Sequence, residues 1–421
     1  MLSQSGIFMG LFSMQMGPAT RGLDNQSSPR RAAPSASGDL QVVWFMGPRS
    51  SSWNGVGQHS LIFIRALNRS AGFNVEVIDI PAPARSLKRY WWQFAVYPLL
   101  AIRAARSCDM VVLYQEDLSF LVPFVRLAGG KVCVLFHHVS RPGQARGVLE
   151  RLKELYIRAI RRQVAWSNLV LVESEVTAAE LLEVVPVPPE RMQIMPCPFE
   201  DKYSPLGGPT PRVARARARE ILKERIGLDI GDAILLLNVG SDETRKNNVT
   251  VFRALARMKR KDLVIVRAGK AFNLANRKEC ATLASDMGIR AHFLDSVSDE
   301  DLGYLYQAAD MYVSASLHEG FGRTVIEAQI AGTPVVASNM PVYRATMGDS
   351  FLPVSDPADP DAWVTAIDRL ANDPVLAERL VERGKINARQ YSSDVLCASL
   401  REGLLRATGA DTVDGKHTSA E

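Results

Sequence analysis

The stretch from residue 311 to residue 337 has the order of a parallel α/β unit. Residues 311–313 are apolar and predict a buried strand, the glycines of residues 320–322 predict a turn, residues 325–328 suit the packed face of a helix, and residues 333–337 predict a second strand. A strand, a glycine turn, a helix and a strand in this order are typical of an open parallel sheet. This part of the chain is therefore expected to be a doubly wound α/β domain.

Two acidic side chains flank the glycine turn. Glu319 and Glu327 are eight residues apart, with Gly320, Phe321 and Gly322 between them. In open parallel sheets, ligands bind outside the carboxyl ends of the strands and at helix N-termini. Two carboxylates at that edge can hold the hydroxyl groups of a sugar or a ribose, so the segment predicts a nucleotide-sugar site.

The same alternation extends over most of the chain. Apolar strand patterns separated by helical patterns occur in both halves, and residues 200–209, which are rich in Pro and Gly, suit a hinge. We expect two Rossmann-like domains, at residues 39–204 and 205–390. A final segment, residues 391–421, is expected to be a helix that returns to the first domain, followed by a loose tail. Residues 1–38 are expected to be disordered; they suit no folded element, and residues 24–38 are polar and rich in Pro and Ser.

Composition narrows the functional class. The chain has 421 residues, 47% of them hydrophobic, and no apolar run near 18 residues, so no membrane-spanning helix is expected. Its five cysteines are scattered without C-x-x-C spacing, which argues against a zinc site or a disulfide framework and favours a cytoplasmic location. Residues 1–206 contain 22 Lys and Arg against 16 Asp and Glu, so an anionic partner is expected on the N-terminal half. No nucleic-acid motif accompanies this charge.

Four segments carry a family resemblance. They are "NGVGQHS", "LLLNVGSDETRKNN", "VSDEDLGYLYQAADMYVSASLHEGFG" and the E-x7-E segment with its internal G-F-G. In this order they resemble the family 4 retaining glycosyltransferases, which have the GT-B fold, and the resemblance covers most of residues 40–400. It implies transfer of a sugar from a nucleotide donor to an acceptor, with retention of anomeric configuration and without a metal.

Catalytic roles follow from the resemblance. Arg245 and Lys246 would contact the diphosphate, and Glu319 would lie beside the donor sugar. The resemblance implies a reaction without a metal, so fixed cations are the expected stabilisers of the leaving group. A solvated basic turn is the alternative for the Arg–Lys pair. The resemblance also points to His137, or its neighbour His138, as the histidine that faces the sugar across the cleft; a histidine satisfied at the sheet edge is the alternative.

Donor binding is assigned in the same way. Glu327 would hold the ribose hydroxyls, although Thr324 and Glu327 also have the T-x-x-E spacing of a capping box, in which Glu327 would only satisfy a backbone N–H. The remaining expected donor contacts lie on glycine turns and at the start of the predicted helix; they are Gly240, Phe321, Gly322, Arg323, Thr324, Gly55 and Gly57. The family commonly has Asn-Gly where this chain has Cys197 and Pro198, so contacts from that loop are open.

Residues 85–107 mix Lys and Arg with five aromatic residues. This composition suits the interface of a membrane, which would make the protein a peripheral enzyme acting on a lipid-linked sugar. The alternative is that the aromatic side chains pack into the core.

The donor is a nucleotide sugar and the acceptor a saccharide or a lipid-linked saccharide, in polysaccharide or glycolipid synthesis. The loop "VGSDETRKNN" resembles mannosyl-type members and favours GDP-mannose. Two rival functions remain: a nucleotide-sugar enzyme of the same fold that needs no acceptor, and a non-catalytic module that only binds the nucleotide sugar.

Overall fold

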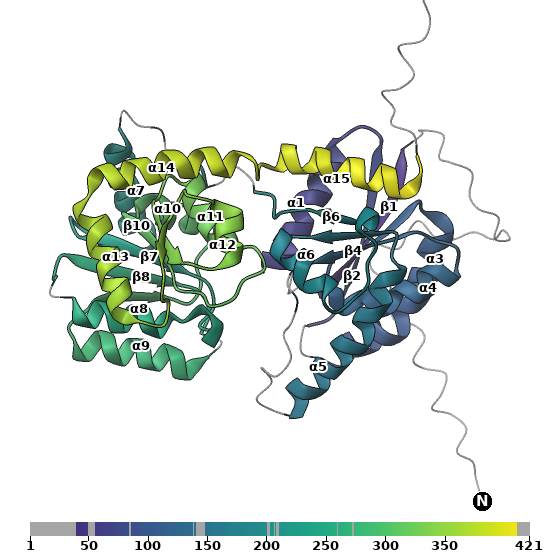
Figure 1. Cartoon of the computed structure of the whole chain (residues 1–421), viewed down its shortest axis with the longest axis horizontal. Coiled ribbons are helices and arrows are strands. Elements are labelled where there is room, and N and C mark those ends of the chain that lie inside the picture. The colour runs from purple at the N-terminus through teal and green to yellow at the C-terminus, as the bar shows by residue number, and fades with distance from the viewer. Residues whose placement is uncertain are drawn as a thin grey trace, which may run out of the picture.

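The computed structural model describes two α/β lobes joined side by side (Figure 1). The described residues are 39–48, 55–83, 86–137, 139, 148–199, 203–205, 207, 210–258, 260–271 and 273–410. The expectations for residues 1–38 and for the tail after residue 410 lie outside this part of the chain. We refer to residues 39–199 as the N-domain and to residues 210–389 as the C-domain.

The N-domain contains a six-stranded sheet of order β2-β1-β3-β4-β5-β6, in which all neighbouring strands are parallel. Its elements are β1 (Leu40–Pro48), α1 (Gly55–Arg69), β2 (Phe73–Ile80), α2 (Leu87–Trp91), the π-helical turn η3 (Trp92–Val96), α3 (Tyr97–Ser107), β3 (Met110–Leu113), η4 (Glu116–Leu121), α4 (Val122–Leu127), β4 (Val132–Phe136), α5 (Val148–Arg161), η5 (Arg162–Trp166), β5 (Leu169–Val172), α6 (Glu175–Leu182), η6 (Pro189–Arg191) and β6 (Met192–Ile194).

The C-domain contains a second parallel sheet, of order β12-β11-β10-β7-β8-β9. Its elements are α7 (Pro211–Ile226), β7 (Ile234–Val239), η8 (Thr244–Lys246), α8 (Asn248–Arg257), β8 (Leu263–Ala268), α9 (Leu274–Asp286), β9 (Arg290–Leu294), α10 (Asp299–Ala308), β10 (Met311–Ser314), α11 (Arg323–Ile330), β11 (Val335–Ser338), α12 (Pro341–Met347), β12 (Leu352–Val354), α13 (Pro360–Asn372) and α14 (Pro374–Arg389). This is the doubly wound strand order of dinucleotide-binding folds.

The central strands are buried on both faces. All residues of β3, β4 and β5 are buried, as are those of β8, β10 and β11. Continuous apolar runs of this kind are what parallel strands need when helices cover both faces of the sheet. The expected architecture of two Rossmann-like domains is confirmed.

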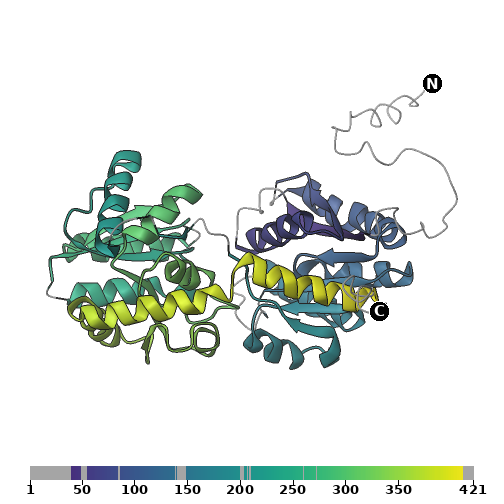
Figure 2. The same ribbon diagram turned by 90° about the horizontal axis from the view of Figure 1, so that it is seen from above.

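Two chain segments cross between the domains. One runs from β6 to α7 and the other from α14 to α15 (Ser393–Thr408), which lies along the N-domain (Figure 2). They pair where they cross, because the Phe199 N–H donates to the Tyr391 carbonyl and the Ser393 N–H donates to the Phe199 carbonyl. Leu396, Leu400 and Leu404 of α15 belong to the N-domain core.

The five cysteines are free thiols, as the sequence predicted. Among the described helices, none combines the length and the apolar character that a membrane crossing requires.

Candidate functional site

The candidate site lies at the carboxyl edge of the C-domain sheet. The strand order reverses between β7 and β10, and the loops that follow these two strands therefore diverge from a common point. In open α/β sheets this topological switch point is where ligands bind. The loops are joined there, since the Leu317 N–H donates to the Arg245 carbonyl at 2.7 Å.

A buried ion cluster supports the loop after β7. Asp242, which is 2% exposed, lies between two guanidinium groups, with Arg267 at 2.9 Å and Arg277 at 2.6 Å. Arg267 and Arg277 also donate to the carbonyl oxygens of Gly240 and Gly269. The cluster fixes the backbone that leads to Arg245. The sequence analysis missed it, although an arginine at the end of the apolar strand "LVIVRA" was a visible signal.

Arg245, Lys246 and Glu319 meet at the switch point. Lys246 Nζ lies 2.5 Å from Glu319 Oε1, and Arg245 Nη1 lies 2.9 Å from Glu319 Oε2. Ser316 donates a hydrogen bond of 2.7 Å to the same carboxylate. Two cations and one acid from the two loops thus share a single point, where a diphosphate and the sugar attached to it would both find partners.

These contacts determine the ionisation of Glu319. Burial by itself would raise the pKa of its carboxyl, but the charges of Lys246 and Arg245 outweigh burial and lower the pKa to about 2. Glu319 is therefore ionised at neutral pH, and each cation is partly neutralised by it.

Glu327 does not cap the helix. The N-cap of α11 is Gly322, and the Glu327 carboxylate accepts a hydrogen bond of 2.8 Å from the Tyr306 hydroxyl and one of 3.3 Å from Arg323. The capping-box alternative for Thr324 and Glu327 is therefore wrong, because the helix begins one residue before Thr324. Glu327 is 5% exposed, and its oxygens are held by fixed side chains at the base of the loop.

The glycine turn requires its glycine at residue 322. Gly322 has φ of 93°, a left-handed conformation, and a Cβ there would lie 2.5 Å from the Tyr343 ring. Phe321 packs edge-on against Tyr391 with ring centroids 5.2 Å apart, and the Arg323 guanidinium lies 4.8 Å from the centre of the Phe199 ring. The turn is thus seated on the crossing segments between the domains.

The N-domain holds this turn directly. Ser174 and Thr177, in the first turn of α6, donate to the Gly320 carbonyl at 2.9 and 3.2 Å. We call these two hydrogen bonds the interdomain clasp. It ties the turn between Glu319 and Glu327 to the opposite lobe.

His137 lies in a buried cluster of the N-domain and is 7% exposed. Its Nδ1 lies 2.5 Å from Glu173, and its Nε2 lies 2.9 Å from the Tyr114 carbonyl, so both ring nitrogens are engaged within the N-domain. Its predicted contact with the donor sugar stays a prediction. His59 and Cys197 complete the cluster, at 2.9 and 3.1 Å from the same Glu173 oxygen. We call these four residues the HHEC cluster; the sequence analysis did not assign His59 or Glu173 to a site.

The pKa values of the groups in the HHEC cluster shift in different directions. Burial lowers the pKa of His59 to about 4 despite the nearby Glu173 carboxylate. Burial would also lower the pKa of His137, but Glu173 outweighs it and the net shift is upward. Burial raises the pKa of the Cys197 thiol, and Glu173 raises it further.

Gly55 and Gly57 lie in the first turn of α1, and Gly57 is buried. Residues 49–54 of the preceding loop lie outside the described residues, as does His138. Gly240 directly follows β7 and has φ of 137°, a backbone conformation that favours glycine; a Cβ on it would make only an ordinary contact of 3.5 Å with the Lys246 side chain.

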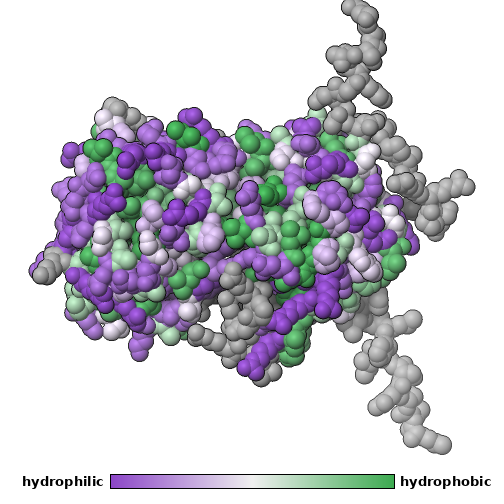
Figure 3. Space-filling model, in the orientation of Figure 1, coloured by the Kyte–Doolittle hydropathy of each residue, from purple (hydrophilic) through white to green (hydrophobic). Residues whose placement is uncertain are grey.

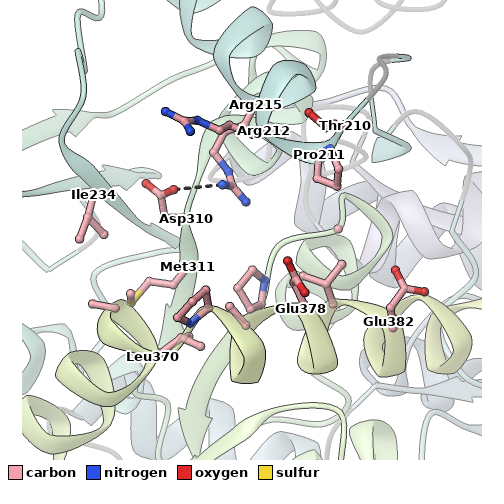
Figure 4. Close-up of a pocket in the computed structure, with 16 residues that line it drawn as sticks. Thr210, Pro211, Arg212, Arg215, Ile234, Asp310, Met311, Leu370, Glu378 and Glu382 are labelled. Carbon is pink, nitrogen blue, oxygen red and sulfur yellow. Dashed lines mark ion pairs between the residues drawn. The ribbon is translucent and has the colours of Figure 1, made fainter.

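A separate cavity of about 650 Å³ opens at the other edge of the C-domain sheet (Figure 4). It lies between α7 and the helices α13 and α14, beside the amino ends of β7 and β10, where Arg215 and Asp310 form an ion pair of 3.3 Å. Because ligands of doubly wound sheets bind at the carboxyl ends, we do not assign this cavity to the donor.

Two facing Rossmann-like domains, with cations and carboxylates at the switch point of the second, define the class of GT-B proteins. Among solved structures, HepE from Anabaena, described in complex with UDP and glucose, has this fold with a TM-score of 0.71. It is 16% identical to this chain, and the match covers 87% of this chain and 100% of HepE.

Sequence comparison then narrows the class. Residues 220–387 match the family model "Glycosyl transferases group 1". A D-inositol 3-phosphate glycosyltransferase from Xylanimonas cellulosilytica is 28% identical over 249 residues, which are 58% of each chain, and an O-antigen chain mannosyltransferase B from Escherichia coli is 42% identical over 100 residues, which are 24% of this chain and 26% of that enzyme. The chain thus spans little more than half the length of the first of these relatives. Residues 220–387, which lie within the C-domain, are thus similar to the group 1 glycosyltransferases.

Proposed function

We propose that the protein is a retaining glycosyltransferase of the family 4 type, which transfers a sugar from a nucleotide donor to a saccharide or lipid-linked acceptor. The observation that carries this proposal is the meeting of Arg245, Lys246 and Glu319 at the switch point of the C-domain sheet. A nucleotide sugar presents an anionic diphosphate and a hydroxyl-rich sugar next to each other, and this site offers a matching pair of cations and an acid.

Each residue has a role in the proposed reaction. The bond between the sugar and the diphosphate breaks through an oxocarbenium-like state while negative charge grows on the leaving phosphate. Arg245 and Lys246 would stabilise that charge electrostatically. Glu319 would turn to the sugar hydroxyls once the diphosphate has taken over the two cations. No metal is needed for these steps.

Glu327 would accept hydrogen bonds from the ribose hydroxyls. A buried carboxyl group with two oxygens is suited to hold two neighbouring hydroxyls. The backbone N–H groups at the start of α11, beside Gly322 and Arg323, would contact the phosphates, because a helix N-terminus favours an anion.

GDP-mannose is the donor that we favour. The mannosyl-type loop of residues 239–248 supports it, and so does the 42% identity to an O-antigen chain mannosyltransferase over 100 residues. HepE, which is described in complex with UDP, is only 16% identical to this chain. Its similarity therefore supports the fold but does not decide which nucleotide base the donor of this chain carries.

A thermal-shift panel tests the donor site. We expect one of UDP, GDP, ADP and TDP, with GDP favoured, to raise the melting temperature of the wild type. A ligand at about 100 times its dissociation constant stabilises a fold by about 2.7 kcal/mol. Glu327→Gln should lose most of this shift, because hydrogen bonds to a charged group contribute about 1.5–3 kcal/mol each.

Glu378→Gln is the matched control, since Glu378 is an exposed acid that lines the separate cavity of the C-domain. A shift that survives in Glu327→Gln and disappears in Glu378→Gln would move nucleotide binding to that cavity and would contradict the proposed site. Turnover separates the rival functions: a binding module leaves the nucleotide sugar intact, and an acceptor-independent enzyme consumes it without any acceptor. Proton NMR of the first-formed product tests retention.

We further propose that the N-domain docks on an anionic membrane, which would place the protein on the cytoplasmic face. Four side chains on α2 and η3 are strongly exposed: Leu87, Tyr90, Trp91 and Phe94, with 88%, 49%, 60% and 46% of their surfaces accessible. Lys88 and Arg89 lie among them, and Figure 3 shows hydrophobic and hydrophilic side chains side by side on this lobe. The core-packing alternative holds for Tyr97, which is fully buried and donates to the Met46 carbonyl.

Flotation with vesicles tests this membrane proposal. We expect binding to vesicles that contain anionic lipid at low salt, and much weaker binding of the Leu87→Ser, Trp91→Ser double variant. Leu274→Ser, which changes an exposed apolar residue of the C-domain (73% exposed), is the control. Failure of the wild type to float at low salt would remove the membrane from the proposal.

A further inference from the structure

The cavity between α7 and α14 has the size and the lining of a small-molecule site. Its volume of about 650 Å³ is in the range of about 300–1,000 Å³ that is typical of ligand pockets. Ile234 and Met311 line it at the amino ends of β7 and β10, and Leu370, Ala377 and Val381 line it from α13 and α14. These side chains give the cavity an apolar surface on which an apolar group could be buried.

The α7 side of the cavity carries more positive charge than its acidic partner neutralises. Arg215 pairs with Asp310 at 3.3 Å, but Arg219 lies nearer to the same carboxylate, at 2.6 Å, so one acid serves two guanidinium groups. Arg212 also lines the cavity, and among the described residues no acid forms an ion pair with it. The first turn of α7 contains no acidic residue. This side is therefore suited to an anionic group of a ligand, and a carboxylate matches the geometry of guanidinium groups.

The α14 side of the cavity carries an acid that has no cationic partner. Glu378 lines the cavity and points from α14 toward the α7 side (Figure 4). No lysine or arginine of the described part of the chain pairs with Glu378, whereas its neighbour Glu382 pairs with Lys385 at 2.9 Å. Opposite charges thus face each other across an apolar cavity without forming an ion pair, and a ligand that carries both charges could satisfy both sides.

We propose that this cavity binds a small zwitterion with an apolar body, which is the chemistry of an apolar α-amino acid or a short apolar peptide. The ligand's carboxylate would contact Arg212 and Arg215, its ammonium group would donate to Glu378, and its apolar side chain would pack against Met311 and Leu370. Each contact joins a protein charge that lacks a full partner to the opposite charge of the ligand.

This site is separate from the proposed donor site. Arg245, Lys246 and Glu319 lie at the carboxyl edge of the C-domain sheet, and the cavity lies at its amino edge. A smaller cavity of about 190 Å³ shares Arg215 with it and extends to Pro205, on the segment that crosses from the N-domain to α7. A ligand here would not compete with the donor, and it would act on transfer only as a regulator, from beside the connection between the domains.

Three indole compounds test the proposal on the full chain. L-Tryptophan carries both charges, indolepropionate lacks the ammonium group, and tryptamine lacks the carboxylate. In isothermal titration calorimetry without nucleotide, we expect L-tryptophan to bind at one site per chain. Each of the other two compounds should bind at least about 10-fold more weakly, because it leaves one protein charge without its partner.

Variants locate the two charged contacts. Arg212→Gln should weaken the binding of L-tryptophan by about 10-fold and leave that of tryptamine unchanged, because tryptamine has no carboxylate for the arginine. Glu378→Gln should weaken L-tryptophan in the same way and leave indolepropionate unchanged. The matched controls are Arg217→Gln and Glu224→Gln, which remove exposed charges of α7 outside the cavity lining and should change no affinity.

Two outcomes would overturn the proposal. One is that L-tryptophan does not bind at millimolar concentration, or binds in a way that Arg212→Gln and Glu378→Gln leave unchanged. The other is that indolepropionate binds as tightly as L-tryptophan, because Glu378 would then take no part. Since the titration contains no nucleotide, its outcome is separate from that of the donor panel, which depends on Glu327.

Discussion

Glu319 is the residue on which the candidate site depends. Its carboxylate forms ion pairs with Arg245 and Lys246 and accepts a hydrogen bond from the Ser316 hydroxyl. The diphosphate of a bound donor would compete with Glu319 for the same two cations. In the free protein it therefore acts as a substitute anion, which keeps Lys246 and Arg245 in place. A diphosphate that displaces it gains two ready-made partners and frees the carboxylate for the sugar.

The acid sensitivity of the fold should depend on Glu319. Its pKa is about 2 in the folded chain, against an ordinary value of 4.5, so its contribution is complete above about pH 4.5 and is lost as the pH falls toward 2. A depression of this size corresponds to about 3 kcal/mol at neutral pH. We expect Glu319→Gln to destabilise the protein at pH 7 and the difference from the wild type to shrink at pH 4, as measured by urea unfolding.

A matched control separates this effect from general charge loss. Glu300→Gln removes an exposed acid that also pairs with an arginine, at 2.8 Å from Arg225. Exposed pairs contribute about 0–1 kcal/mol, so this variant should be nearly silent at both pH values. A Glu319→Gln effect that is the same at pH 7 and pH 4 would contradict the assignment of the low pKa to Glu319.

Lys246 should govern the rate more than the fold. Lys246→Met keeps the length of the side chain and removes the charge that would face the leaving phosphate, so we expect kcat to fall by about 10²-fold or more. Lys223→Met, which removes a lysine paired with Asp229 on the surface, is the control. If Lys246→Met turns over the donor with a normal kcat, the proposed stabilisation of the leaving phosphate by Lys246 is wrong.

At the scale of elements, the start of α11 determines the shape of the donor turn. Gly322 combines a left-handed backbone with close contact to Tyr343, whose hydroxyl is 2.7 Å from Ser314 Oγ. The turn is thus packed against the end of β10 and against α12, and it has no room for a side chain. This packing holds the first N–H groups of α11 in position.

Gly322→Ala should therefore lower the free energy of unfolding by more than the strain of a left-handed alanine, because the new Cβ would also collide with the Tyr343 ring. Gly288→Ala is the control, because Gly288 also has a positive φ, of 64°, and a Cβ there would meet nothing within 4 Å. We expect Gly288→Ala to cost about 1 kcal/mol and Gly322→Ala to cost clearly more, as measured by thermal unfolding. Equal losses would show that the Tyr343 ring moves aside freely.

The helices and strands were the features of this chain that the sequence predicted best. Strands such as β10 and β11 are short apolar runs that only a sheet covered on both faces can bury, and Ser298 caps α10 as its position before an apolar stripe suggests. The loops were less predictable, because their contacts come from distant segments. Nothing in the spacing of Glu327 shows that Tyr306 donates to it, and the capping-box alternative was wrong because α11 begins at Arg323, one residue before Thr324.

The HHEC cluster was the least predictable feature. Its four residues come from four separate segments, and spacing along the chain is informative only when interacting residues lie on one or two neighbouring segments. Here His59 and Cys197 are 138 residues apart in the chain and meet only through the sheet order. The replacement of the expected asparagine by Cys197 was the one visible sign.

At the scale of the whole molecule, the two domains are joined in two different ways. The two crossing segments pair with each other at Phe199 and Ser392, where the chain passes between the domains. The interdomain clasp, by contrast, consists of two hydroxyl groups on one carbonyl and can open without breaking either domain. Enzymes of two facing domains commonly close around their substrates, so the clasp is suited to hold the closed state.

Thr177→Val tests the clasp with little change in shape. Thr177 is 1% exposed, and the variant removes its hydrogen bond to Gly320 while Ser174 still caps α6. The loss of one hydrogen bond, about 0.5–1.5 kcal/mol, should open the domains more often, which lowers nucleotide affinity by about 2- to 13-fold and increases the radius of gyration in solution scattering. Thr365→Val, which removes an exposed hydroxyl bonded within α13, should change neither. If Thr177→Val also leaves both quantities unchanged, closure depends on the hinge packing of Phe321, Tyr391 and Arg323 instead, because these contacts remain in the variant.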